Sequence, residues 1–259
     1  AEPTVAKGDA VLLGQEIGKA SHAVSASVHS SVSGTVVAVE PRPAINGRSV
    51  LSVVIDNDGR DAAESMSGHH DPIQLSAEEI KSRVEAAGIV GLGGAAFPTS
   101  VKLNPPEDYK IEYLLLNGSE CEPYLTADQR IMEEHTEDVI LGAKLLAKAV
   151  GADKIVIAVE ANKPEAIKKL QALAGSHQIE VVALAIKYPA GGEKQLIKAV
   201  LGREVPSHGL PSQIGVLVQN VQTAWATAVA CRTGKPLIER VLTVSGDGIK
   251  EPSNFLVRV

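Results

Sequence analysis

Three strongly apolar runs, separated by helical patterns, place the tightest limit on how this chain folds. They occupy residues 113–117, 155–159 and 180–186 and consist mainly of Leu, Ile, Val and Ala. Strands that are apolar throughout are buried on both faces, and helices between them provide the long connections that parallel neighbours require. The pattern therefore predicts an α/β domain with a parallel sheet covered on both faces.

The segments between these runs carry helix signals. We expect a helix over 127–150 that is broken near His135 and Thr136, and a helix over 163–174 with Pro164 in its first turn. A further helix over 193–201 is expected to end at Gly202, and a capping box at 76–79 is expected to begin an earlier one. Ligands of open parallel sheets bind beyond the carboxyl ends of the strands, so we expect the functional residues there.

The first 70 residues have a different pattern. Short Val-rich segments punctuated by glycine predict strands at Val5, at 11–13, over 30–39 and over 50–55. The following segment, 56–72, has small and polar residues and contains Gly and Pro, as expected of a linker. We therefore expect a small all-β module over 1–70 and the α/β domain over 71–236.

The turns of this module resemble those of the barrel-sandwich hybrid fold of lipoyl and biotinyl carriers. Gly-Asp at 8–9, Gly-Gln at 14–15 and a Ser-x-x-x-Gly turn at 30–34 carry the resemblance. Those carriers need a lysine on the hairpin that is modified, and this sequence has none between Lys19 and Lys81. A structural or docking role is therefore favoured over a swinging arm.

The last segment, 237–259, contains a strand pattern over 240–244, a turn at 246–248 and another strand pattern over 255–259. Two strands alone rarely form a domain. We therefore expect this segment to be the start of a further, truncated domain.

Composition excludes several functions. A net charge of −6 argues against nucleic acid as the main partner. No apolar run approaches the 18 or so residues of a membrane span, so we expect no direct span. The two cysteines form no CxxC pair and cannot hold an iron–sulfur cluster by themselves, and we expect no metal site.

The segment Gly91-Leu92-Gly93-Gly94-Ala95-Ala96-Phe97-Pro98 is the strongest candidate for a ligand site. Bare glycine backbone can approach a phosphate closely, and Lys102 follows within reach of the same anion. The segment fits the dinucleotide fingerprint G-x-G-x-x-A, but it follows a predicted helix rather than a strand, which argues against a Rossmann turn. A glycine-rich turn without a ligand remains an alternative.

Further polar residues follow the predicted strands. They are Asn117, Glu120 and Glu122 after the first run, Tyr188, Gly191, Gly192 and Glu193 after the third, and Asn220 near 219–223. If the strands are parallel, these side chains meet at one edge of the sheet. No nucleophile or metal ligand accompanies the two glutamates, so binding is favoured over acid–base catalysis, and we assign no catalytic residue.

The glycine loop ending in Ala-Phe-Pro-Thr, the motif Asn-x-x-Glu-x-Glu-Pro at 117–123 and the segments 188–193 and 219–223 together resemble a known family. They are similar to the NADH-oxidising flavin subunit of respiratory complex I and to the RnfC component of Rnf electron transport complexes. The β module ahead of them is similar to the Rnf type. The resemblance implies that 237–259 begins a β-grasp domain of the SLBB (soluble-ligand-binding β-grasp) type.

The resemblance also implies roles for individual residues. Gly91, Gly93 and Gly94 would hold the FMN phosphate and ribityl chain, with charge added by Lys102. Asn117 and Asn220 would hydrogen-bond the FMN, and Gly191 and Gly192 would admit backbone close to its ring. Phe97 would stack on NADH. Glu122 and Glu193 would meet the ribose or nicotinamide side of NADH. The remaining candidates, Glu120 and Tyr188, would belong to the same cofactor site.

The implied activity is that of an NADH-linked oxidoreductase, or translocase, subunit. It would be peripheral, at the cytoplasmic face of the inner membrane, with other subunits of an ion-translocating complex as partners. Hydride would pass from NADH to FMN, and electrons would then pass to 4Fe-4S clusters, which are expected only in a C-terminal region that this chain lacks.

Two departures from the complex I pattern keep alternatives open. Ser119 stands where that pattern has an acidic residue, and Gly192 stands where it has a glutamate. A non-catalytic docking module with a decayed flavin site is therefore one alternative. Another NADH–flavin reductase of the same group is a second.

Overall fold

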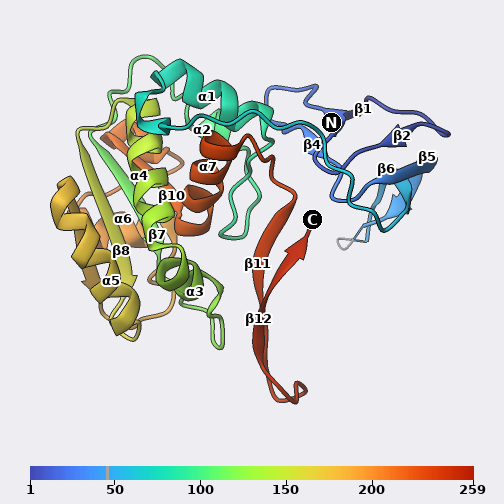
Figure 1. Ribbon diagram of the computed structural model, residues 1–259. Coiled ribbons are helices and arrows are strands. Elements are labelled where there is room, and N and C mark those ends of the chain that lie inside the picture. The colour runs from blue at the N-terminus through green and yellow to red at the C-terminus, as the bar shows by residue number, and fades with distance from the viewer. Residues whose placement is uncertain (45–46) are drawn as a thin grey trace.

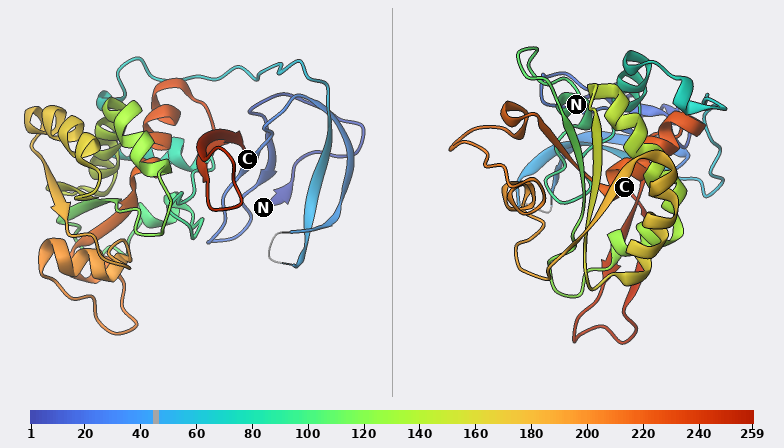
Figure 2. Two further views of the ribbon diagram at one scale, coloured as in Figure 1. Left: turned by 90° about the horizontal axis from the view of Figure 1, so that it is seen from below. Right: turned by 90° about the vertical axis from the view of Figure 1, so that its left-hand side faces the viewer.

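The computed structural model describes residues 1–44 and 47–259. An α/β body and a small β module stand side by side, and a two-stranded hairpin at the C-terminal end lies between them (Figure 1). A long segment without helices or strands joins the module to the body (Figure 2).

The body is built on four parallel strands. They are β7 (Tyr113–Gly118), β8 (Lys154–Glu160), β9 (Ile179–Leu184) and β10 (Val216–Asn220). Their order across the sheet is β10-β7-β8-β9, and every neighbouring pair is parallel, as predicted. The fourth strand, β10, was not predicted. Its register places Asn220 opposite Asn117, so two candidate residues meet at the carboxyl edge of the sheet.

Helices cover both faces of this sheet. Leu114, Leu116 and Ile157 point into the larger core, where five helices pack over them. These helices are α1 (Ala77–Ala86), α3 (Ala127–Glu134), α4 (Thr136–Val150), α5 (Pro164–Ala174) and α7 (Val221–Thr233). The alternate residues Leu115 and Val156 point to the opposite face, where α6 (Glu193–Leu201) covers them. This two-sided burial explains the continuous apolar runs of the sequence.

Most predicted helix boundaries are confirmed. Ser76 and Glu79 form the capping box of α1, and α3 and α4 are separated at His135. The third apolar run, predicted as a strand to 186, instead ends at Leu184, because the chain turns there into the segment 187–192. A short helix, α2 (Thr99–Lys102), follows the glycine loop and was not predicted.

The β module contains two three-stranded sheets. Its strands are β1 (Glu2–Pro3), β2 (Ala10–Val11), β3 (Glu16–Lys19), β4 (Val28–His29), β5 (Gly34–Pro43) and β6 (Ser49–Asn57). The sheets have the orders β1-β3-β4 and β2-β5-β6, and Val11, Ile17 and Val36 form the buried core between them. Val5 is not in a strand, which corrects the prediction there, although it packs against this core.

The hairpin contacts both the body and the β module. It consists of β11 (Glu239–Val244) and β12 (Ser253–Arg258), paired antiparallel. Gln222 of α7 accepts a hydrogen bond from the backbone N–H of Val241 at 2.7 Å. At the other end, Arg258 donates to both carboxylate oxygens of Asp61, at 2.6 and 2.7 Å. Within the described residues, no helix is long and apolar enough to cross a bilayer.

The packing of α4 on α7 offers a test of this fold. A Cβ atom placed on Gly142 would lie 1.9 Å from the carbonyl oxygen of Ala224, so Gly142→Ala must push the helices apart. We expect a loss of about 2 kcal/mol in the free energy of unfolding, measured by urea titration, because overpacking outweighs the gain in helix propensity. Gly175→Ala is the matched control, since a Cβ there meets nothing within 4 Å, and it should leave stability within about 1 kcal/mol of the parent. Equal effects of the two substitutions would contradict this packing.

Candidate functional site

Two adjoining cavities form a cleft at the carboxyl ends of β7 and β10. The larger has a volume of about 570 Å³ and the smaller about 410 Å³. Gly93, Gly94, Asn117, Gly191 and Asn220 line both cavities. This is the edge of the sheet at which open α/β folds bind ligands.

The glycine loop forms one wall of the cleft. The backbone N–H of Gly91 donates to the carbonyl of Phe97 at 2.8 Å, which closes the loop at its base. Gly94 has a φ of +133°, a conformation that requires glycine. Gly93 packs on Asn220, because a Cβ added to Gly93 would lie 3.2 Å from that of Asn220. The loop follows helix α1, as predicted, and therefore differs from a Rossmann turn.

Lys102 lines the smaller cavity with the glycine loop, as its spacing predicted. Its ammonium group lies 2.9 Å from a carboxylate oxygen of Glu193 and donates to the carbonyl of Val218 at 3.0 Å. Both charged side chains are about one third exposed, at 32% and 39%. The loop segment and the first turn of α6 are therefore joined by an ion pair in the wall of this cavity.

Asn117 fixes the opposite wall of the cleft. Its side-chain nitrogen donates to the carbonyl of Gly191 at 2.8 Å, and its side-chain oxygen accepts from the backbone N–H of Ser119 at 3.0 Å. A Cβ on Gly191 would lie 2.8 Å from the carbonyl oxygen of Ser119, so only glycine fits this approach. One on Gly192 would lie 2.6 Å from the side chain of Gln195, which can move.

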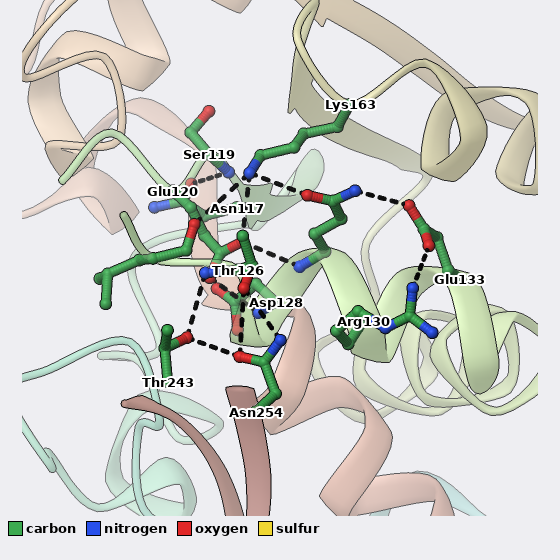
Figure 3. Close-up of polar contacts among 12 residues, drawn as sticks. Asn117, Ser119, Glu120, Thr126, Asp128, Arg130, Glu133, Lys163, Thr243 and Asn254 are labelled. Carbon is green, nitrogen blue, oxygen red and sulfur yellow. Dashed lines mark hydrogen bonds and ion pairs between the residues drawn. The ribbon is translucent and has the colours of Figure 1, made fainter. Parts of the chain in front are cut away.

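Glu120 is buried and engaged with the protein itself. Its two carboxylate oxygens accept from the backbone N–H groups of Asp128 and Gln129, at 2.8 and 2.9 Å, at the first turn of α3. The ammonium group of Lys163 lies 3.9 Å away (Figure 3). Glu120 therefore satisfies the open N-terminus of α3, a role that the sequence did not reveal.

The remaining predicted residues differ in exposure. Glu122 lines the larger cavity, and its carboxylate contacts no partner among the residues the structure describes. Phe97 lines the smaller cavity and is 37% exposed. Tyr188 is 70% exposed and lines neither cavity, so of the predicted residues it is the one that the structure leaves outside the cleft wall.

Several residues of the cleft wall were not assigned to the site from the sequence, and Asp128, Arg240 and Gln219 are among them. Asp128 of α3 and Arg240 of β11 line the larger cavity, and Gln219 of β10 lines the smaller. Burial and the nearby Glu120 raise the pKa of Asp128 to about 7. Nothing local in the sequence marks these residues, because each reaches the cleft only through tertiary packing. The one signal is position, since Asp128 begins a predicted helix and Gln219 adjoins Asn220.

Comparison with known proteins places this cleft in a family. Residues 84–229 match the family described as the Nuo51 FMN-binding domain, and residues 1–60 match the RnfC barrel sandwich hybrid domain. The chain belongs to the Nuo51 FMN-binding domain family. The predicted resemblance and fold class are thereby confirmed, and the glycine loop, Asn117, Gly191 and Asn220 all fall within the matched segment.

Curated relatives are named as parts of ion-translocating oxidoreductase complexes, and each is the component designated C of its complex. The chain is 49% identical over 259 residues to that component of the Na(+)-translocating ferredoxin:NAD(+) oxidoreductase complex of Acetobacterium woodii. It is 45% identical over 258 residues to the proton-translocating counterpart of Clostridium ljungdahlii, and 43% over 265 residues to the counterpart in the ion-translocating oxidoreductase complex of Rhodobacter capsulatus. These alignments cover 99%, 99% and 100% of this chain but only 58%, 56% and 51% of the relatives.

A solved structure supports the fold alone. An NAD+-reducing [NiFe]-hydrogenase in the H2-reduced state matches with a TM-score of 0.60 and 24% sequence identity. The match covers 73% of this chain and 38% of that one. The matching part of this chain therefore shares its architecture with part of a longer chain.

The role of Glu120 can be tested by stability. Glu120→Gln puts an NH2 group opposite a backbone N–H of α3 and removes the charge that faces Lys163. We expect a loss of about 2 kcal/mol in the free energy of unfolding by urea titration, typical of a hydrogen bond to a charged group. Glu122→Gln, two residues along and exposed, should change it by less than about 0.5 kcal/mol. Two equal effects would contradict a capping role for Glu120.

Proposed function

We propose that this chain binds FMN and NADH in the cleft and serves as the NADH-oxidising flavin subunit of an ion-translocating electron transport complex. The observation that carries the proposal is the cleft itself, which combines a glycine loop, a lysine and two asparagines at the carboxyl edge of a parallel sheet. Membership in the FMN-binding family supports the flavin, and the names of the relatives support the complex.

The residues present fit a flavin nucleotide. Glycine is required at Gly191, where backbone approaches backbone at the cleft wall. Three buried polar atoms of cleft residues, Gln219 Nε2, Ser119 Oγ and Arg240 Nε, have no hydrogen-bond partner among the described residues. Buried polar atoms in folded proteins nearly always have one, so groups of this kind suit a polar ligand.

Each wall of the cleft has a proposed task. Gly91, Gly93, Gly94 and Lys102 hold the phosphate, the loop by close approach of its backbone and the lysine by charge. Asn117 and Asn220 fix the walls against which the flavin lies, and bound flavin supplies the hydride-accepting and electron-releasing chemistry. The protein contributes position, since hydride transfer needs the two rings held in contact.

Glu122, whose carboxylate has no partner among the described residues, lines the larger cavity and suits a contact with the NADH substrate. We propose that Glu122 accepts hydrogen bonds from ribose hydroxyls of NADH and repels the extra 2′-phosphate of NADPH. We propose that Phe97, a partly exposed residue that lines the smaller cavity, covers the nicotinamide ring. Glu193 takes part through its ion pair with Lys102, and Glu120 holds α3 in place. Tyr188 is proposed only as a residue of the cleft entrance.

The proposal also covers the division of the chain into domains and the onward path of the electrons. We propose that 1–70 is a docking module, that 71–236 is the cofactor domain, and that 237–259 begins an SLBB β-grasp domain. Among the described residues, no group of three or more His, Cys, Asp or Glu side chains could hold a metal ion. Onward transfer is proposed to use 4Fe-4S clusters carried by other parts of the protein or by partner subunits at the cytoplasmic face of the membrane.

A flavin titration tests the proposal. The purified chain should quench FMN fluorescence on binding, and NADH should then bleach the visible absorption of the bound flavin. Lys102→Ala should weaken FMN binding roughly tenfold, as expected for the loss of one charge-assisted hydrogen bond. Lys187→Ala is the control, because this exposed lysine lines neither cavity and should leave affinity unchanged.

The same experiment separates the alternatives. A folded chain that does not bind FMN would indicate a docking module whose flavin site has decayed through Ser119 and Gly192. A chain that binds FMN but is not reduced by NADH would contradict the nucleotide half of the proposal. Equal weakening by the two lysine substitutions would contradict the phosphate assignment.

A further inference from the structure

A largely buried hydrogen-bond chain forms part of the cleft wall and involves an acid that the proposed chemistry does not use. The side-chain nitrogen of Asn220 donates to the carboxylate of Asp128 at 2.6 Å. The side-chain oxygen of Asn220 accepts from the backbone N–H groups of Gln222 and Thr223, at 2.8 and 3.3 Å, and so caps α7. Both ends of the Asn220 amide are therefore fixed by the protein.

This series of contacts reaches the proposed phosphate site. Asn220 lines both cavities and packs directly against Gly93 of the glycine loop. A change in the Asn220 side chain would therefore move the loop or the N-terminus of α7. Among the described residues, Asp128 is the one side chain that is hydrogen-bonded to the Asn220 side chain, whose other partners are backbone N–H groups of α7.

The groups that act on Asp128 come from several elements. Burial raises its pKa most, and Glu120, in the segment after β7, raises it further by repulsion. Hydrogen bonds from Asn220 and Gln222 and the charge of Arg240 in β11 lower it, but the pKa remains at about 7. Asp128 is only 9% exposed, so solvent screens the charge of its ionised form poorly.

We propose that Asp128 is a positioning residue that holds Asn220 against the glycine loop and couples the binding of an anionic ligand in the cleft to the uptake of a proton. The inference rests on the proposed function, in which that ligand is FMN. Asp128 lines the larger cavity and is hydrogen-bonded to Asn220, which lines both cavities, so an ionised Asp128 adds negative charge beside the phosphate site and opposes an anion there. A neutral Asp128 removes this repulsion and still offers a carbonyl oxygen to Asn220.

The test compares the parent with Asp128→Asn, which mimics the neutral acid. FMN dissociation constants are measured by fluorescence at about pH 6, 7 and 8 for both proteins. The phosphate of FMN itself titrates near pH 6, and taking the ratio of the two constants cancels this effect. We expect a ratio near one at the lowest pH, and several-fold tighter binding by the variant at the highest. A ratio that does not change with pH would overturn the coupling.

A second variant tests the positioning role. Asp128→Ser is also uncharged but is too short to reach Asn220. Because both variants are uncharged, Asp128→Ser should bind FMN several-fold more weakly than Asp128→Asn at every pH. Equal affinities of the two variants would overturn the positioning role. If the parent itself binds no FMN, the proposed function fails. If the parent binds FMN but the ratio of the two constants does not change with pH, only the coupling fails.

A measurement without FMN checks the charge state. The pKa of Asp128 is higher in the folded protein than its ordinary value of 3.8, so ionisation costs stability as the pH rises from about 4 to about 7. The urea midpoint of Asp128→Asn should therefore rise relative to the parent across this window and stay level above it. Asp108→Asn, at an exposed position, is the control for the removal of one carboxylate. A constant difference between Asp128→Asn and the parent would contradict the proposal.

Discussion

The buried carboxylate of Glu120 is the contact on which the cleft depends. A charge in this position is tolerated only if it is paired and hydrogen-bonded, and Glu120 meets this condition with two backbone N–H groups of α3 and a nearby lysine. The contact ties the end of β7 to the start of α3. Because α3 carries Asp128, which in turn holds Asn220, the position of one glutamate fixes the opposite side of the cleft.

The hairpin extends this arrangement to the rest of the chain. Arg240 of β11 donates to the carbonyl of Leu92 in the glycine loop at 3.2 Å, and Thr243 accepts from the backbone N–H of Thr126 at 3.1 Å beside α3 (Figure 3). At its far end, Arg258 is paired with Asp61 beside the β module. The hairpin is therefore one wall of the cleft and also a direct link between the cofactor domain and the β module.

The sequence predicted those features that depend on local pattern. Runs such as 155–159 identify buried strands because they are apolar throughout and too short for helices, and Gly191 was identified because it follows the third run and the family resemblance implies a close backbone approach there. The role of Glu120 was not predictable in this way, because its carboxylate looks like a ligand group in the sequence and only the packing of α3 shows that the protein itself uses both oxygens. Lys102 shows the same limit, since spacing predicted which cavity it reaches but not that Glu193, 91 residues later, pairs with it. Contacts of this kind need the complete topology, because loop lengths and strand order decide which side chains meet.

The charge balance of the cleft follows from these pairings. Four carboxylates approach a site proposed for anionic ligands, which would be unfavourable if all four were free. Glu120 is neutralised by α3 and Lys163, Glu193 by Lys102, and Asp128 by burial that favours its protonated form. Only the carboxylate of Glu122 has no partner among the described residues, and it stands in the larger cavity, away from Lys102 and the proposed phosphate position. The uncompensated negative charge of the cleft is therefore confined to the larger cavity, where a carboxylate could meet sugar hydroxyls rather than phosphate.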